Sequence, residues 1–427
     1  TWPSPSHWDI DNDGDHDLLF SSHSDNLSTA NYNAIAFYKN LGTDAAPNFV
    51  FQHDTLLTLD MIDVGSFSYP TFFDYNKDGK PDLFVGTEGY FNNVTSQLQS
   101  KLAYYKNTST AGNTSFELVS KDFLNLSQKN YKGIFPTFGD MTGDGVDDLI
   151  LGNANGSIAV YKNFAPTNAA MPNFLFFTDS INNVTVGNYS FPVVFDFNQD
   201  GKTDLLVGNQ IGSLAYFQDT STAVNQKKMA LINDSIGNFI AGAPVNFHGY
   251  CAPFIGKVDN TQNIYLLIGN IDGTIQRFDE NFKNNLGNFT RIDSNYSHIK
   301  TAARSVPAVA DLDGDGFYEL VVGNKFGGLH YYKQVLTINA TNYEISKNSI
   351  AIYPNPSTGL ISILYKNPIE NQDATLLVVD ISGRLVHHEK FETSSKSQFD
   401  ISSLQTGLYH IGIELKGQKI WKKVIKN

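Results

Sequence analysis

Residues 9–20 read DIDNDGDHDLLF, in which five aspartates occupy every second position directly before an apolar run. In an extended strand alternate residues share one face, so these carboxylates would lie together and repel one another. The repulsion implies either that a cation lies among the side chains or that the segment is a solvated turn. The apolar residues 18–20 that follow predict a buried strand.

The same pattern recurs along the chain, which makes internal repetition the first guide to the fold. Each copy has a proline four residues before its first acidic position, and successive prolines are 54 to 66 residues apart. A further copy, PFIGKVDNTQNIYLLIG from Pro253, keeps this spacing without the acidic residues. The acidic copies after the first are DYNKDGKPDLFVG from Asp74, DMTGDGVDDLILG from Asp140, DFNQDGKTDLLVG from Asp196 and DLDGDGFYELVVG from Asp311.

Six repeats of this length predict an all-β fold. Each reads as a strand, an acidic loop, an apolar strand, a glycine turn, an aromatic strand such as AYYKN from Ala103, and a stretch able to form a fourth strand. One such sheet cannot bury its faces alone, and radial stacking of sheets in a β-propeller buries them. A linear solenoid is the alternative, but its repeats are shorter. We expect a propeller over residues 1–335 with six or seven blades, because a blade or strand could precede Thr1.

The acidic loop has the spacing of a calcium-binding loop. Oxygen ligands at positions 1, 3, 5 and 9, a backbone carbonyl at position 7 and glycine at position 6 suit a hard cation of calcium's size. A ligand set of oxygen alone disfavours zinc and copper, and magnesium prefers to keep its waters. The predicted ligands are Asp9, Asp11, Asp13, Asp15 and Asp17; Asp74, Asn76, Asp78, Lys80 and Asp82; Asp140, Thr142, Asp144, Val146 and Asp148; Asp196, Asn198, Asp200, Lys202 and Asp204; and Asp311, Asp313, Asp315, Phe317 and Glu319, with the fourth of each set acting through its carbonyl.

Solvated acidic turns are the alternative, since Asp-Gly pairs are common in turns for backbone reasons. Five copies in one register favour about five Ca²⁺ sites. The remaining copy has Lys257 at position 1, Gln262 in place of glycine and Tyr265 at position 9. We expect that loop to be metal-free, with the Lys257 ammonium near Asp259 in place of the cation.

These motifs resemble the FG-GAP/VCBS family of calcium-binding propeller repeats, which also occur in integrin α-subunit heads and several lectins. The pattern D-x-[DN]-x-DG-x-x-DL-x-x-G with its preceding proline carries the resemblance over residues 1 to about 335. The resemblance implies calcium loops at one rim of the propeller that mainly stiffen the blades. It is specific for the fold and not for a ligand.

Residues 350–427 differ from the repeats and form alternating strands separated by polar turns, which predicts a small immunoglobulin-like β-sandwich. Residues 336–349 are expected to supply the last outer strand and a linker. The domain resembles the type A C-terminal sorting domain of the bacterial type IX secretion system. The residues that carry this resemblance are Tyr353, Pro354, Asn355, Pro356 and Gly359, then Gly383 and Arg384, then Gly407 and Tyr409, and finally Lys422 and Lys423.

The sorting domain implies export across the outer membrane of a Gram-negative, Bacteroidota-like bacterium, through contact with the type IX translocon and its sorting peptidase. An ordinary immunoglobulin-like module is the alternative. Three Asp-[Ser/Thr]-aliphatic triplets resemble O-glycosylation sites of such bacteria, although a shared structural turn explains them as well. They are Asp54-Thr55-Leu56, Asp179-Ser180-Ile181 and Asp234-Ser235-Ile236.

Composition excludes several classes of function. A net charge of -13 disfavours nucleic-acid binding, which needs basic patches. No segment is long and apolar enough for a membrane span, and we expect a soluble protein. The lone Cys251 rules out an internal disulfide and stands where other repeats have serine, which favours a small buried residue. The chain opens on TWPSPSHWD without an initiating methionine or a signal peptide, as expected of a trimmed or processed form.

The sequence contains no recognisable catalytic motif, so we expect no enzyme activity. The function predicted is a secreted or cell-surface binding or adhesion module, whose surface ligand is a glycan or a protein. The alternative is an accessory propeller of a larger secreted enzyme whose catalytic domain lies upstream of Thr1.

Overall fold

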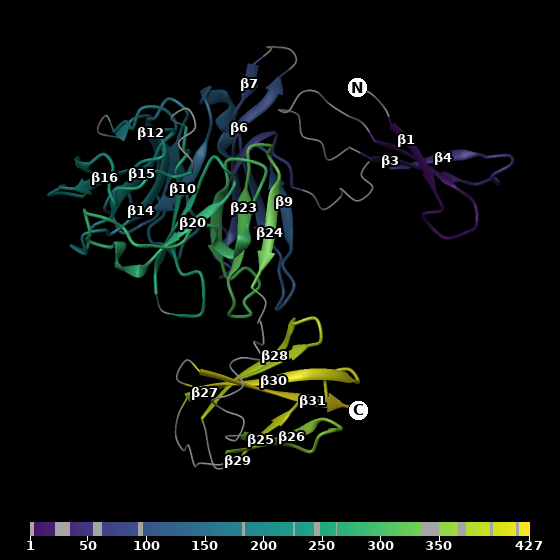
Figure 1. Ribbon diagram of the computed structural model, residues 1–427. Helices are drawn as coiled ribbons and strands as arrows, with labels where there is room; N and C mark the ends of the chain where they lie inside the picture. Colours follow the sequence, from purple (N-terminus) through teal and green to yellow (C-terminus); the bar gives the residue numbers. More distant parts are fainter. Residues whose placement is uncertain are drawn as a thin grey trace. The chain divides into compact units, whose positions relative to one another are not determined.

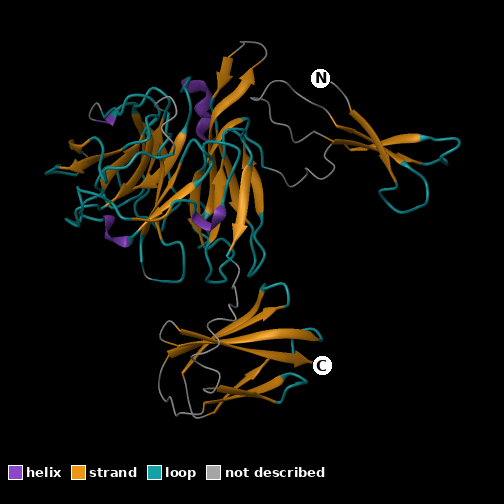
Figure 2. Ribbon diagram, in the orientation of Figure 1, coloured by secondary structure: helices purple, strands orange, loops and turns teal. Residues whose placement is uncertain are grey.

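A computed structural model describes most of the chain, and its regular secondary structure is almost entirely β-strand (Figures 1 and 2). The described residues are 4–21, 35–53, 62–92, 97–181, 184–224, 227–242, 248–261, 263–334, 350–365, 373–392, 396–415 and 418–427. The chain divides into two compact units: Thr1–Ser109, Ser115–Leu312 and Gly316–Tyr332 form the first, and Thr110–Thr114, Asp313–Asp315 and Lys333–Asn427 form the second.

Each of the six repeats forms an antiparallel sheet whose strands are paired in sequence order. The predicted all-β class is therefore confirmed. The first repeat contains β1 (Ser4–Trp8), β2 (Asp17–Ser21), β3 (Ile35–Asn40) and β4 (Phe49–His53). The second contains β5 (Ser66–Phe73), β6 (Asp82–Asn92), β8 (Leu102–Asn107) and β9 (Phe116–Ser120), with β7 (Gln97–Gln99) paired to β6.

The later repeats have the same order, and among the described residues short 3₁₀ helices follow the second repeat and lie within and after the fifth. The third contains β10 (Phe135–Gly139), β11 (Asp148–Gly152), β12 (Ile158–Asn163) and β13 (Phe174–Thr178); the fourth β14 (Phe191–Phe195), β15 (Asp204–Gly208), β16 (Leu214–Asp219) and β17 (Met229–Asn233). The fifth contains β18 (Ala252–Gly256), β19 (Tyr265–Gly269), β20 (Ile275–Phe278) and β21 (Arg291–Asp293); the sixth β22 (Val306–Ala310), β23 (Glu319–Gly323) and β24 (Leu329–Lys333). The helices are η1 (Phe123–Lys129), η3 (Glu280–Phe282) and η4 (Tyr296–His298).

The repeated proline lies on the first strand of each sheet, where one edge has no strand partner within that sheet. Proline has no N–H to donate, so an edge strand tolerates it. The second strand is the apolar run of each repeat, and from the third repeat onward all five of its residues are buried. A strand covered on both faces reads as such a continuous apolar run.

Neighbouring repeats are joined by one recurring backbone hydrogen bond. The residue two before the repeated proline donates its N–H to a carbonyl just beyond the second strand of the preceding repeat, as Ser190 does to Asn153 at 3.0 Å. The same bond links Ile134 to Thr87, Cys251 to Asn209 and Ser305 to Asn270. Ser68 of the second repeat donates to Asn324 of the sixth at 3.0 Å, which closes the ring.

The close approach at each joint requires glycine at the end of the second strand. A Cβ on Gly152 would lie 2.0 Å from the Ser190 carbonyl oxygen, and one on Gly323 would lie 2.1 Å from that of Ser68. Gly86, Gly208 and Gly269 meet the next repeat in the same way. The first repeat has Ser21 at this position of its sequence, so it lacks the residue that the joint needs.

The ring that these joints close contains five blades, the second to sixth repeats, rather than the six or seven expected. The physical reason is the contact between Gly323 and Ser68, which leaves no room for another blade between the sixth repeat and the second. Six repeats are present as predicted, and the sheet of the first repeat is described by itself.

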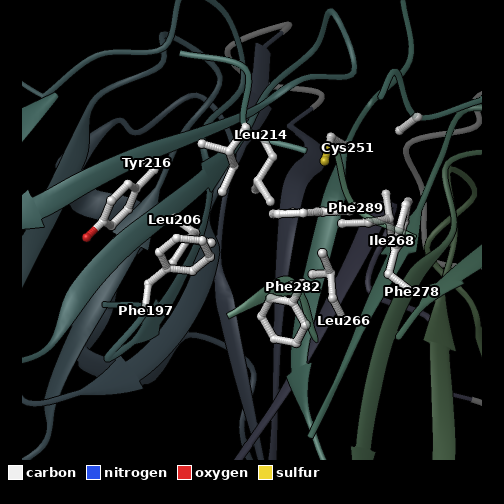
Figure 3. Packing of buried hydrophobic residues seen from close by; sticks show 12 residues of the cluster. Phe197, Leu206, Leu214, Tyr216, Cys251, Leu266, Ile268, Phe278, Phe282 and Phe289 are labelled. Atoms are coloured by element: carbon white, nitrogen blue, oxygen red, sulfur yellow. The ribbon is translucent and has the colours of Figure 1, made fainter. Parts of the chain in front are cut away.

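Hydrophobic cores fill the spaces between neighbouring blades. Figure 3 shows the core between the fourth and fifth repeats, where Phe197 and Leu206 face Leu266 and Phe282. Cys251 belongs to this core, is fully buried, and has the pKa of its thiol raised by burial. The expectation of a small buried residue agrees with this environment.

The second compact unit contains a β-sandwich. One sheet has the order β25-β26-β29 and the other β28-β27-β30-β31, and side chains such as Ile363, Val378 and Ile411 form one core between them. The predicted sandwich is confirmed. Its strands are β25 (Ile350–Tyr353), β26 (Leu360–Tyr365), β27 (Asp373–Asp380), β28 (Leu385–Glu392), β29 (Lys396–Asp400), β30 (Gly407–Leu415) and β31 (Gln418–Lys426).

The joint glycine can be tested by adding one methyl group. We expect Gly152→Ala to destabilise the propeller by about 3 kcal/mol, because its Cβ meets a backbone carbonyl that cannot move without shifting a blade. Gly328→Ala is the matched control, since the nearest atom to its Cβ is 3.7 Å away. Urea denaturation of both variants measures the difference, and equal midpoints would contradict the role of the joint.

Candidate metal centre

The acidic residue at loop position 9 is fully buried in all five acidic loops, at Asp17, Asp82, Asp148, Asp204 and Glu319. In four loops one of its oxygens accepts the N–H of the residue that ends the third strand, as Asp148 does from Asn163 at 2.8 Å. The other oxygen accepts the N–H of loop position 2, as Asp148 does from Met141 at 3.0 Å. The position 9 carboxylate thus ties the loop to the sheet.

Burial affects the acidity of these carboxyl groups. Desolvation raises the pKa of Asp148 to about 6, against the opposing effect of hydrogen bonds from Asn163 and Thr142. The pKa values of Asp82 and Asp204 are raised for the same reason. A nearby cation would favour the charged form of each group.

The first half of each loop curls around the carboxylate at position 1. The position 6 glycine donates its N–H to that carboxylate, at 2.8 Å for Gly145 to Asp140 and at 3.0 Å for Gly79 to Asp74. These glycines have positive φ, near +86° for both Gly145 and Gly79, which explains the glycine predicted there. The loop thereby directs the side chains at positions 1, 3 and 5 toward one another.

The structure brings together the predicted ligands at positions 1, 3 and 5. Carboxylate oxygens of Asp9, Asp11 and Asp13 lie within 4.8 Å of one another, and so do those of the sixth repeat, Asp311, Asp313 and Asp315. One oxygen of Asp74 is buried and accepts no hydrogen bond from the described residues. An oxygen-only donor set with an unsatisfied buried carboxylate oxygen fits a calcium ion.

Every acidic loop has a donor on the carboxylate at position 5. In the second and fourth repeats it is the amide of the position 3 asparagine, such as Asn76 to Asp78 at 2.9 Å. In the first, third and sixth repeats it is a lysine of the third strand. These lysines are Lys39 on Asp13, Lys162 on Asp144 and Lys333 on Asp315.

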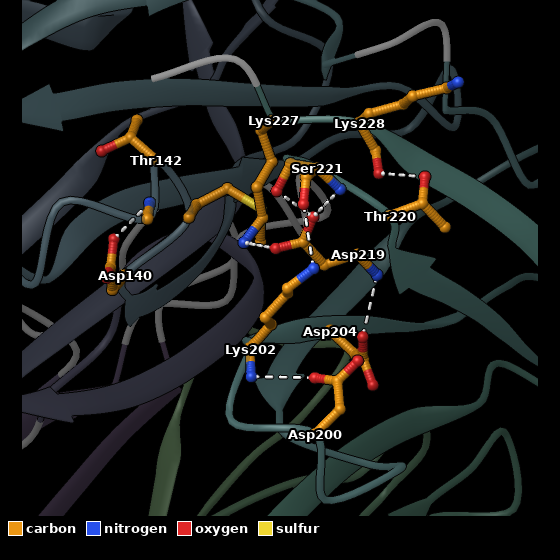
Figure 4. A network of polar contacts seen from close by, with 12 residues as sticks. Asp140, Thr142, Asp200, Lys202, Asp204, Asp219, Thr220, Ser221, Lys227 and Lys228 are labelled. Carbon is orange, nitrogen blue, oxygen red and sulfur yellow. Dashed lines mark hydrogen bonds and ion pairs between the residues drawn. The ribbon is translucent and has the colours of Figure 1, made fainter. Parts of the chain in front are cut away.

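The position 7 residues of the second and fourth repeats direct their side chains away from the loop. Lys80 Nζ donates to the Ser109 carbonyl at 2.6 Å, and Lys202 Nζ donates to that of Ser221 at 2.9 Å. Figure 4 shows the loop of the fourth repeat, where Asp204 accepts from Asp219. The ammonium groups of these two lysines therefore do not neutralise the acidic side chains.

The loop of the fifth repeat is built differently. Its Asp259 forms an ion pair at 3.3 Å with Arg277 on β20, whose guanidinium also lies 3.9 Å from the centre of the Tyr265 ring. Tyr265 stands at position 9, where the other loops have a carboxylate. In this loop the contact between the Arg277 guanidinium and the Tyr265 ring therefore takes the place of the hydrogen bonds that the position 9 carboxylate accepts elsewhere. The metal-free state expected around Lys257 stays a prediction, and Gln262 lies outside the described residues.

The hub of the propeller contains an ion pair that the sequence analysis missed. Arg304 of the sixth repeat pairs with Glu88 of the second at 2.8 Å and donates to the Tyr250 hydroxyl at 2.6 Å. Its guanidinium also lies over the Tyr250 ring, 3.9 Å from its centre. The available signal was that arginine occurs only four times in the chain and stands here beside the repeated proline.

The residues of the predicted sorting signal lie at one end of the sandwich and in its turns. Asn355 accepts the N–H of Ile425 and donates to the Lys423 carbonyl, both at 2.9 Å, which links the Tyr353–Pro356 segment to the last strand. Gly383 and Arg384 form the β27–β28 turn, where Arg384 pairs with Asp380 at 3.1 Å. Tyr409 is buried, Gly359 has a positive φ, and Lys422 lies on β31.

Two of the three predicted glycosylation triplets can be located. Ile181 and Ile236, their aliphatic residues, are buried in cores between blades, which supports the shared structural turn. The triplet at Asp54 lies outside the described residues, and glycosylation stays a prediction.

Comparisons with known proteins agree with the repeats and with the C-terminal domain. A family model described as an FG-GAP-like repeat matches residues 9–85, and one described as an FG-GAP repeat matches residues 303–337. A model of the secretion system C-terminal sorting domain matches residues 351–427. The chain carries FG-GAP repeats and a type IX sorting domain. Both resemblances are confirmed, and the sorting domain makes the protein Bacteroidota-like.

Among curated proteins the FG-GAP chain is similar to integrin alpha pat-2 of Caenorhabditis elegans, with 23% identity over 287 residues. The match covers 58% of this chain and 21% of the relative, so the chain spans about a fifth of that protein's length. One solved structure, BBS1N in complex with ARL6DN, matches at 14% identity and a TM-score of 0.24, covering 79% of this chain and 93% of that one. Dimeric latent PorU from Porphyromonas gingivalis matches at 9% identity and a TM-score of 0.15, covering 90% and 36%.

The sorting domain indicates type IX secretion to the cell surface or the extracellular space, and it implies interaction with the type IX secretion system. FG-GAP repeats and sorting domains are non-catalytic modules. Among the described residues, no helix is both long and apolar enough to cross a membrane.

The structural role of position 9 predicts a difference between two aspartates of one loop. With calcium removed by a chelator, we expect Asp204→Asn to destabilise the protein by about 2 kcal/mol. The carboxylate of Asp204 accepts hydrogen bonds from two backbone N–H groups and a tyrosine hydroxyl, and the NH₂ group of asparagine would face one of these donors without an acceptor between them. Asp200→Asn is the control, since this exposed residue keeps its acceptor oxygen, and we expect a change within about 0.5 kcal/mol. Equal losses in urea denaturation would contradict the assignment.

Proposed function

We propose that this chain is a secreted, calcium-stabilised FG-GAP propeller that acts at the cell surface as a non-catalytic binding or adhesion module. The observation that supports it most is that five acidic loops share one backbone geometry and an oxygen-only donor set in a chain with a type IX sorting domain. In this proposal residues 1–335 form the repeat region, 336–349 connect it, and 350–427 direct export.

Calcium would be held by the side chains at positions 1, 3 and 5 and by the position 7 carbonyl, with the position 9 carboxylate adding negative charge behind them. When bound, the ion supplies the positive charge that these crowded carboxylates need. Extracellular sites of this class have dissociation constants of roughly 0.1 to 1 mM. At free calcium about ten times that constant, each occupied site adds about 1.4 kcal/mol of stability.

The proposed ligand-binding face lies at the end of the blades opposite the acidic loops. Those loops join the first and second strands, so the turns between the second and third strands lie at the other end of each antiparallel sheet. There, a cavity of about 450 Å³ lies between the second and third repeats. Tyr131, Lys129, Lys132, Asn155 and Asp179 line it, an aromatic and polar set suited to a polar ligand such as a glycan.

A binding role is also supported by the relative named integrin alpha, although the chain spans only a part of that protein.

Calcium stabilisation can be measured by calorimetric melting. We expect the propeller transition to move to higher temperature in millimolar calcium and to lower temperature with a chelator, because calcium binds the folded loops and not the unfolded chain. Magnesium at the same concentration is the control, and we expect a smaller shift. A transition that is the same in calcium and in chelator would refute the stabilising role.

Ligand binding can be tested on a glycan array and on a panel of immobilised proteins. If the cavity contributes, the double variant Tyr131→Ala with Lys132→Ala should lose at least about tenfold in affinity, the equivalent of one stacking or charged contact. Lys228→Ala, a change at an exposed lysine between β16 and β17, at the end of the blades with the acidic loops, is the control. If the unmodified protein binds no glycan and no protein in these panels, the binding role is refuted and only a structural role remains.

A further inference from the structure

In three of the five acidic loops a lysine ammonium of the third strand lies among the predicted metal ligands. Lys162 Nζ lies 2.5 Å from an oxygen of Asp144, and only a tenth of the lysine side chain is exposed. Lys333 Nζ lies 2.5 Å from Asp313 and 3.0 Å from Asp315. Lys39 pairs with Asp11 and, at 3.2 Å, with Asp13.

The other loops show that this lysine is not a general requirement of the fold. In the fourth repeat the register of the third strand puts Gln218 where the third repeat has Lys162. There the Asn198 amide donates to Asp200 instead, at 3.1 Å. The second repeat uses Asn76 in the same way. The second repeat has a lysine at the same third-strand position, Lys106, but its Asp78 accepts from the Asn76 amide, so a lysine pairs with the position 5 carboxylate only in the loops whose position 3 residue supplies no amide.

An ammonium and a calcium ion need the same oxygens. The ammonium offers three N–H donors, each of which takes one carboxylate oxygen at hydrogen-bond distance. Calcium needs six to eight oxygens at about 2.3 to 2.6 Å, which must include the side-chain oxygens at positions 3 and 5. Two cations this close repel each other, so one loop cannot hold both at the same oxygens.

We propose that Lys39, Lys162 and Lys333 are tethered counter-ions: they hold their loops in the folded shape before calcium is available, and calcium displaces them. This inference rests on the proposed calcium function. It means that the lysines set the calcium concentration at which the first, third and sixth loops load, whereas the second and fourth loops load without displacing an ammonium.

The displacement can be followed on the unmodified protein by lysine acetylation and mass spectrometry across a calcium titration. We expect acetylation of the three lysines to rise severalfold as calcium binds, because each ammonium leaves its carboxylates. Lys80 and Lys202 are internal controls, since they lie at loop positions but donate to backbone carbonyls, and their acetylation should stay constant.

Variants test the competition directly. By calorimetry, Lys162→Met should raise the calcium affinity of one site about tenfold, and Gln218→Lys should lower that of another by a similar factor, the equivalent of one charge-assisted hydrogen bond. Lys228→Met, a change at an exposed lysine that lies in none of the acidic loops, should change neither. Calcium binding with unchanged acetylation and unchanged affinities would overturn the inference but leave the proposed function standing. Absence of any calcium binding by the unmodified protein would overturn both.

Discussion

The structure depends on the close approach of two backbones where one blade meets the next. Gly152 lies against the Ser190 carbonyl without a side chain between them, and four other glycines do the same around the ring. This contact sets the angle between neighbouring blades, and five such contacts complete the circle from Gly323 to Ser68. The ring places the acidic loops of its blades at one end and the turns between the second and third strands at the other. The division between the end with the acidic loops and the end with the polar turns therefore depends on a ring that a steric constraint on glycine closes.

The acidic loops compensate their negative charges in two ways, one for the carboxylate at position 9 and one for the side chains at positions 1, 3 and 5. The carboxylate at position 9 is buried, which is costly, and the N–H groups that point at it offset the cost, as those of Met141 and Asn163 do for Asp148. The carboxylates at positions 1, 3 and 5 remain closer to solvent and need a positive charge or an amide donor. Lys162 supplies the charge in one loop and Asn198 the amide in another. The carboxylate at position 9 ties the loop to the sheet, and we propose that a metal ion binds at positions 1, 3 and 5.

The repeat period and the apolar run after each loop predicted the strands, the sheets and the position of every acidic loop. Blade number could not be predicted, because the contact between Gly323 and Ser68 joins residues far apart in the sequence and only a complete ring shows that it forms. The N–H groups that donate to the position 9 carboxylate were also hidden, because they come from residues whose proximity depends on the fold. The recurring lysine of the third strand was visible, but the copies that pair with their loop were not: Lys162 contacts Asp144, whereas Lys106 has the same register beside a loop whose Asp78 accepts from Asn76.

The joint that closes the ring differs from the other four, and the difference lies at one residue position that recurs in every blade. The residue three before the repeated proline has a positive φ in every blade, +57° at Tyr189 and +51° at Arg304. The backbone conformation at this position is the same in every blade while the side chain differs, so the turn does not require a particular side chain. Arg304 uses this position to reach Glu88, across the same joint at which the ring closes. The other joints lie between consecutive repeats and are helped by chain connectivity. The closing joint joins the ends of the ring and has only noncovalent contacts, so an additional partly buried ion pair stabilises it where the chain cannot.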